Sequence, residues 1–178
     1  NKYYFFDTSK HILLNNLQPL KLLKINHDNL QQSCDISDET LKIISEKLKN
    51  KGINSFVIFH PSAQYQYKIY PQNLRNELLT QLNGLGLPIL VTGGNNKIDK
   101  DIKKQIPSLS NVYDFIGETT IEEYFALVYL SDAYIGMDTL NMHIAASLNK
   151  RIFAIFGPTN LSMWSPWSNK LQLSATQD

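Results

Sequence analysis

Short runs of apolar residues recur along this chain, separated by longer segments in which apolar and charged positions alternate with helical spacing. The runs are rich in Ile, Val and Phe and are spaced by roughly 20 to 35 residues, which is typical of buried strands joined by helices. We therefore expect strands at residues 55–59, 88–92, 111–116, 133–137 and 151–156, and a sixth at residues 170–173.

Helix signals occupy the segments between these runs. Ser37 precedes an acidic pair and is expected to be an N-cap, and Gly52 stands where a C-cap glycine belongs. Thr119 and Thr120 each lie three residues before a Glu, which is the spacing of a capping box. The signals predict a helix between Ser37 and Gly52, helices at residues 73–82 and 97–105, one that runs to Leu130, and a short helix that carries His143.

Continuous apolar strands separated by helices indicate one parallel sheet with both faces covered. The predicted fold class is therefore α/β, a Rossmann-like doubly wound parallel sheet. In the strand order 3-2-1-4-5, the first and fourth strands are neighbours and the order reverses between them. Ligands of such sheets bind outside the carboxyl ends of the strands at this switch point.

Polar residues and glycines follow the strands that meet at this point. His60-Pro61-Ser62 come just after the first strand, and Asp138-Thr139 come just after the fourth; the second loop, Thr92-Gly93-Gly94-Asn95, lies beside them. The helix that starts behind Asp138 offers unpaired N–H groups and the positive end of its dipole. We therefore expect three loops to form one crevice for a polar, phosphorylated ligand.

Composition narrows the class of protein. The chain has 178 residues, of which 43% are apolar and 19% charged, as in ordinary folded domains. A formal net charge of +1 gives no reason to expect a nucleic-acid partner. The single cysteine, Cys34, excludes an intramolecular disulfide and a multi-cysteine zinc site. No apolar run approaches the ~20 residues that cross a bilayer.

The first 34 residues lack a clean periodicity. We interpret residues 1–34 as a connecting segment or the tail of a missing amino-terminal domain, and residues 35–178 as the Rossmann-like domain. The chain opens at Asn1 without a Met or a signal-peptide pattern, which favours a piece of a longer protein.

Several motifs between residues 55 and 166 resemble those of the heptosyltransferase family, glycosyltransferase family 9, in order and spacing. A Lys-x-Tyr-Pro motif has Tyr where the family has Trp, and an Asp-Thr-x-x-Met-His segment precedes a Phe-Gly-Pro-Thr strand end. The residues that carry the resemblance are His60–Ala63, Lys68–Pro71, Leu90–Gly94, Phe115–Thr120, Gly136–His143, Ala145-Ala146 and Phe156–Thr159.

The resemblance implies the carboxyl-terminal half of a GT-B glycosyltransferase, in which two Rossmann-like domains face each other across a cleft. In this family that half binds the nucleotide-sugar donor, usually ADP-L-glycero-D-manno-heptose. The missing half binds the lipopolysaccharide (lipid A-core) acceptor and carries the catalytic base. An inverting transfer of heptose to the lipopolysaccharide or lipooligosaccharide inner core follows, with this fragment inactive by itself. No cofactor and no metal ion are implied.

The lipid acceptor also implies a cytoplasmic location, with peripheral contact at the inner face of the bacterial inner membrane. Within the expected donor site, Lys68 would neutralise phosphate charge and the backbone N–H groups of residues 139–141 would cradle the phosphates. Asp138 would accept hydrogen bonds from sugar hydroxyls, Thr139 would donate one, and Thr119 and Thr120 would border the adenine or ribose. The expected donor-binding residues are Ser62, Lys68, Gly93, Gly94, Thr119, Thr120, Asp138, Thr139, Leu140, Asn141 and His143.

Two positions depart from the family's pattern. Leu140 stands where members commonly have Gly, which would permit a positive φ and a close approach to phosphate. Asn95-Asn96 stand where an acidic residue often contacts the ribose. Both departures bear on which donor is bound.

Plainer interpretations stay open for single residues. Asp138 would cap the next helix, His143 would bond to nearby backbone, Lys68 would be an ordinary surface lysine, Gly93-Gly94 would form a tight turn, and Trp164 and Trp167 would pack a loop.

Two other functions also stay open. One is another nucleotide-sugar enzyme, such as a transferase with a different donor or an epimerase that prefers a uridine nucleotide. The other is a non-catalytic scaffold domain that binds no nucleotide, which the residue Leu140 favours.

Overall fold

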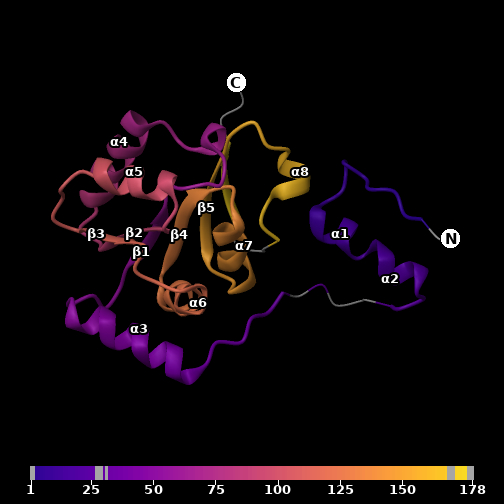
Figure 1. Cartoon of the computed structure of the whole chain (residues 1–178), viewed down its shortest axis with the longest axis horizontal. Helices are drawn as coiled ribbons and strands as arrows, with labels where there is room; N and C mark the ends of the chain where they lie inside the picture. The colour runs from indigo at the N-terminus through magenta and orange to yellow at the C-terminus, as the bar shows by residue number, and fades with distance from the viewer. Residues whose placement is uncertain (1–2, 27–29, 31, 168–170, 176–178) are drawn as a thin grey trace.

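The structure is a computed structural model that describes residues 3–26, 30, 32–167 and 171–175. Within these residues, six parallel strands form one sheet in the order β3-β2-β1-β4-β5-β6. Figure 1 shows helices packed around this sheet. The strands are β1 (Val57–His60), β2 (Ile89–Gly93), β3 (Val112–Ile116), β4 (Ala133–Met137), β5 (Arg151–Phe156) and β6 (Leu171–Ala175).

The helices begin and end where the sequence supplies caps. The side chain of Ser37 accepts a hydrogen bond from Thr40 N at the start of α3, and Gly52 has a positive φ just beyond its end. Thr120 and Glu123 form the capping box of α6. The helices are α1 (Ile12–Asn16), α2 (Gln18–Leu22), α3 (Asp38–Asn50), α4 (Gln72–Asn83), α5 (Lys97–Gln105), α6 (Ile121–Leu130), α7 (Leu140–Ser147) and α8 (Leu161–Trp164), with a 3-10 helix, η1, at Gln66–Lys68.

Two apolar layers hold the helices to the sheet, because successive strand side chains point to opposite faces. Ile58 belongs to the layer that includes residues of α3, α6 and α7. Its neighbour Phe59 belongs to the other layer, with Leu79 of α4 and Ile102 of α5. The helices cover the two faces of the sheet, so a binding site can form at the carboxyl ends of the strands.

The predicted fold class and strand order are confirmed. The strands at residues 133–137 and 151–156 and the helix at residues 97–105 have the predicted bounds. β1 begins two residues later than predicted, because Phe56 N donates its hydrogen bond to the Asp132 side chain instead of to a strand. The sixth strand was predicted from Lys170, which lies outside the described residues, as do parts of the predicted segments 1–34 and 35–178.

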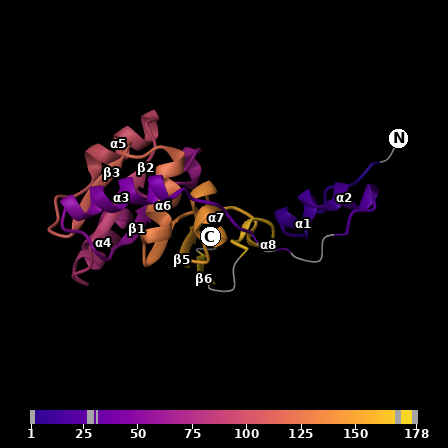
Figure 2. The same ribbon diagram turned by 90° about the horizontal axis from the view of Figure 1, so that it is seen from below.

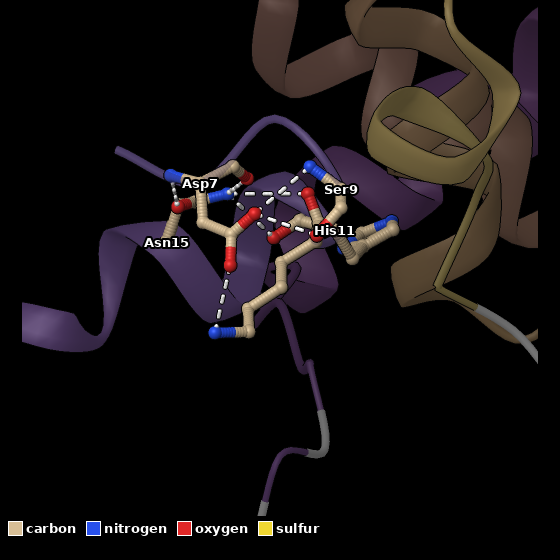
Figure 3. A network of polar contacts seen from close by, with 5 residues as sticks. Asp7, Ser9, His11 and Asn15 are labelled. Carbon is tan, nitrogen blue, oxygen red and sulfur yellow. Dashed lines mark hydrogen bonds and ion pairs between the residues drawn. The ribbon is translucent and has the colours of Figure 1, made fainter. Parts of the chain in front are cut away.

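The amino-terminal segment contains two short helices, which the absence of periodicity did not predict. Figures 1 and 2 show α1 next to α8, with α2 farther out, and both helices away from α4 and α5. The His11 ring lies 4.9 Å from that of Trp167, and His11 Nε2 donates to Ser165 O at 2.6 Å. Figure 3 shows the polar network around the buried Asn15 that shapes this segment. Polar contacts rather than an apolar stripe therefore define it.

None of the helices that the structure describes combines the length and the apolar character needed to cross a membrane.

Candidate functional site

A cavity of about 560 Å³ lies at the carboxyl ends of β1, β2 and β4, where the strand order reverses. This volume is typical of sites for small molecules. The structure therefore brings the three predicted loops to one crevice. Of the expected donor-binding residues, the cavity is lined by Ser62, Lys68, Gly94, Asp138, Thr139, Leu140, Asn141 and His143.

An ion pair joins two of these loops across the cavity wall. Lys68 Nζ, at the end of η1, lies 2.9 Å from Asp138 Oδ2, directly after β4. The two side chains are 22% and 6% exposed, so water screens the pair little. Lys68 is therefore not a free surface lysine. Its ammonium is held by a carboxylate at a place where a bound phosphate would compete for it.

The start of α7 forms another part of the wall. Its N-cap is Thr139, so the interpretation of Asp138 as the cap is wrong. The Thr139 side chain makes no capping hydrogen bond, and the N–H groups of Leu140 and Asn141, in the first turn, have no intrahelical acceptor. This end of the helix can donate backbone hydrogen bonds to an anion.

Leu140 lies in ordinary helical backbone. The only non-glycine residues with positive φ in the described part of the chain are Lys24 and Asn149. Leu140 is also 67% exposed, so its side chain stands at the rim of the cavity. The substitution of Leu for the family's Gly therefore strains no backbone here.

His60 links the loops beneath the cavity, although it was not among the expected donor-binding residues. Its Nε2 accepts a hydrogen bond from Asn141 Nδ2 at 2.6 Å, so its Nδ1 carries the proton and donates to Thr92 Oγ1 at 2.9 Å. Burial lowers the pKa of His60 to about 3, which keeps the ring neutral. His60 thus ties the ends of β1 and β2 to the first turn of α7. The sequence placed His60 at the switch point and in a motif of the resemblance, but it gave no sign of the contacts with Thr92 and Asn141.

Asp99 brings a carboxylate to the wall near the second loop. This residue of α5 is only 2% exposed, and a Cβ at Gly93 or Gly94 would lie 3.0 Å from one of its carboxylate oxygens. The two glycines therefore allow Asp99 to approach the loop. Asn96 accepts a hydrogen bond from Asp99 N and caps α5. An acid thus lines the cavity although Asn95-Asn96 replace the family's acidic residue.

Three of the expected residues are not among those that line the cavity: Gly93, Thr119 and Thr120. Gly93 is the last residue of β2. Thr120 is occupied as a helix cap, since its hydroxyl accepts from Glu123 N at 3.2 Å and its own N–H donates to Glu123 Oε2 at 2.9 Å. Thr119 precedes it in the loop after β3.

His143 and Trp164 line the cavity from the side of α7 and α8. Burial lowers the pKa of His143, while the nearby Asp138 opposes that shift, so the neutral ring is favoured. Trp164 packs against the core and also lines the cavity, so the interpretation that it packs a loop is only part of its role.

In the part of the chain that the structure describes, no three His, Cys, Asp or Glu side chains gather in a way that would hold a metal ion.

Known proteins match this chain over most of its length. The model of glycosyltransferase family 9 (heptosyltransferase) matches residues 8–177. Lipopolysaccharide heptosyltransferase 3 of Escherichia coli is 25% identical over 165 residues, which are 90% of this chain and 48% of that protein. Lipooligosaccharide heptosyltransferase 2 of Haemophilus influenzae is 26% identical over 139 residues, 74% of this chain and 40% of that protein.

Solved structures share the fold. A glycosyltransferase family 9 protein from Veillonella parvula superposes with a TM-score of 0.83 at 19% identity, covering 100% of this chain and 53% of that one. Escherichia coli heptosyltransferase WaaC, solved with ADP, gives a TM-score of 0.73 at 16% identity, covering 99% of this chain and 54% of that one. WaaC has also been solved with ADP-2-deoxy-2-fluoro heptose. The chain thus spans about half the length of the proteins it matches.

Proposed function

Since this chain belongs to glycosyltransferase family 9 (heptosyltransferase), we propose that it is the donor-binding half of an inverting transferase. The whole enzyme would move heptose from ADP-heptose to the inner core of lipopolysaccharide or lipooligosaccharide. The observation that carries the proposal is the Lys68–Asp138 ion pair beside the uncapped start of α7, inside one cavity. A cation and free backbone donors are what a diphosphate requires.

The donor would lie across the switch point of the sheet. Its diphosphate would accept hydrogen bonds from the first turn of α7 and replace Asp138 as the partner of Lys68. Asp138, released from Lys68, would then accept hydrogen bonds from sugar hydroxyls. Each of the two charges that compensate each other in the free protein thereby gains a partner on the donor.

Catalysis by this half would consist of stabilising the departing diphosphate. Negative charge grows on the ADP leaving group as the sugar is transferred, and preorganised donors in a buried site stabilise such charge strongly. The base that activates the acceptor hydroxyl would belong to an amino-terminal domain, which would also bind the lipid acceptor. The enzyme would then work in the cytoplasm at the inner face of the inner membrane.

An exposed aromatic run agrees with a further domain. Tyr3, Tyr4, Phe5 and Phe6 are between 49% and 90% exposed. Contiguous exposed apolar side chains of this kind mark surfaces that contact another part of a protein.

Titration calorimetry with ADP, UDP and GDP tests the proposal. We expect saturable binding with a preference for ADP, and about a 10- to 100-fold loss of affinity in Lys68→Ala, because one charge-assisted contact contributes about 1.5–3 kcal/mol. The matched control is Lys103→Ala, which removes the lysine of the Lys103–Asp114 pair, also 2.9 Å long, away from the cavity. A preference for UDP would favour an epimerase or a different donor. Absence of binding to all three would favour a scaffold domain.

A further inference from the structure

A second cavity, of about 270 Å³, lies between α4, α5 and the segment that joins η1 to α4. It shares no lining residue with the cavity at the switch point. Its polar lining includes Tyr70, Gln72, Arg75, Asp101 and Gln105.

Arg75 is almost completely enclosed at this cavity. The residue is 2% exposed, and its Nη2 donates to Gln105 Oε1 at 2.8 Å. Its Nε is buried and has no hydrogen-bond partner. No carboxylate of the described residues lies within ion-pair distance of it.

A guanidinium in this state is costly. Arg carries five N–H donors and a charge that it does not give up in proteins, and burial lowers the pKa of Arg75 without removing that charge. Buried charges are normally paired, because an unpaired one loses its hydration without compensation. Gln105 is neutral and satisfies one donor only. Among the described residues, Asp101 shares the cavity with Arg75, but no carboxylate pairs with the guanidinium.

We propose that this cavity binds the carboxylate of a small polar molecule, with Arg75 as its ion partner. A planar guanidinium matches the two oxygens of a carboxylate. Gln72 opens α4, and no side chain caps that end of the helix, so backbone donors lie close by. The neutral side chains of Tyr70 and Gln105 provide further polar contacts.

Asp101 selects a carboxylate over a phosphate. Its side chain is 48% exposed and its Oδ1 lies 3.4 Å from Lys104 Nζ, so it stays at the cavity as a partly compensated negative charge. A singly charged carboxylate balances Arg75, whereas a doubly charged phosphate would leave an excess of negative charge beside Asp101.

The test is a titration of the purified protein with glycolate, and separately with inorganic phosphate, followed by amide NMR shifts. We expect saturable shifts with glycolate that centre on Gln72 and Gln105, and at least tenfold weaker binding in Arg75→Met. Asp101→Asn should tighten glycolate binding about threefold. Arg151→Met, which removes the other arginine of the chain, should leave it unchanged.

Several outcomes overturn the proposal. Unchanged binding in Arg75→Met would show that the anion sits elsewhere, and a preference for phosphate would refute the carboxylate class. Absence of glycolate binding together with a loss of thermal stability in Asp101→Asn would identify Asp101 as the counter-ion of Arg75 in solution. If Arg75→Met does not fold, Asp101→Asn decides: tighter binding supports the site, and unchanged binding refutes it. Nucleotide binding plays no part in this test, so its result is independent of the proposed function.

Discussion

The buried polar groups of the amino-terminal segment and those at the carboxyl edge of the sheet differ in what satisfies them. Asn15 is 1% exposed and is surrounded by partners, since it accepts from Asp7 N and donates to the carbonyls of Asp7, Lys10 and His11. At the carboxyl edge, the Asp138 side chain is 6% exposed, and Lys68 is its one ion-pair partner among the described residues. The first network is closed, while the second faces a cavity.

This difference separates two uses of buried polarity. A closed network holds backbone in place, and its loss costs stability because the partners are left unsatisfied. A network that borders a cavity keeps bonding capacity for a ligand. Substitutions at Asn15 should therefore lower the stability of the protein and leave ligand binding unchanged. Substitutions at the cavity should change ligand binding.

The largest expected effect is that of Asn15→Ala. It removes the four side-chain hydrogen bonds that hold this segment together, so we expect the local structure of residues 7–16 to lose about 3 kcal/mol. Amide exchange in that segment should accelerate about a hundredfold. Asn16→Ala is the matched control, since Asn16 is exposed. Weaker ADP binding in Asn15→Ala would break the distinction between the two regions.

The next largest effect is the loss of stability at acidic pH that His60 causes. Burial lowers its pKa from 6.5 to about 3, so the unfolded chain takes up a proton in a range where the folded protein does not. The contribution of His60 to stability is therefore complete above pH ~7 and declines as the pH falls from ~6.5 toward ~3. At pH 5 the loss is about 2 kcal/mol.

Urea unfolding at pH 7 and pH 5 measures this contribution. His60→Gln does not titrate, so its stability should fall by about 2 kcal/mol less between the two pH values than that of the wild-type protein. Equal losses in both proteins would mean that His60 is not buried as the structure has it.

The sequence predicted the sheet well, and the reasons are local. The capping residues Ser37 and Thr120 and the apolar runs of β4 and β5 set element bounds through short-range chemistry. The predicted strand order 3-2-1-4-5 is one of the common orders of such sheets, and the structure has it. The helices α1 and α2 were not predicted, because the side-chain contacts of Asn15 and the pairing of His11 with Ser165 involve no periodic pattern.

The candidate site was predicted in part for the same reason. Residues next to strand ends, such as Ser62 and Asp138, could be placed from topology alone. Asp99 lies inside a helix and reaches the cavity only because Gly93 and Gly94 let it approach. The Lys68–Asp138 pair depends on where the loop after β1 carries η1, which no local pattern in the sequence specifies.

A smaller effect is expected for Asp138→Asn, which rests on the proposed function. Lys68 would lose its anionic partner and become free to bind a diphosphate, so ADP should bind about three- to tenfold more tightly, or by about 1 kcal/mol. Calorimetry with ADP measures the change, and Asp114→Asn, which frees Lys103 elsewhere, is the control. Weaker ADP binding would contradict the separate roles given to Lys68 and Asp138.

The smallest effect should be that of Leu140→Gly, although this is the position where the chain departs from its family. The backbone of Leu140 is helical and the side chain is 67% exposed, so the glycine's freedom to adopt positive φ is not needed. Glycine in the first turn should cost well under ~1 kcal/mol of stability. ADP affinity should change less than about threefold, since an exposed side chain at the rim of the cavity interferes little with contacts to phosphate. A tenfold or larger gain in ADP affinity would instead identify the Leu140 side chain as an obstruction to the donor. The site at the carboxyl edge of the sheet would then be blocked by this one residue.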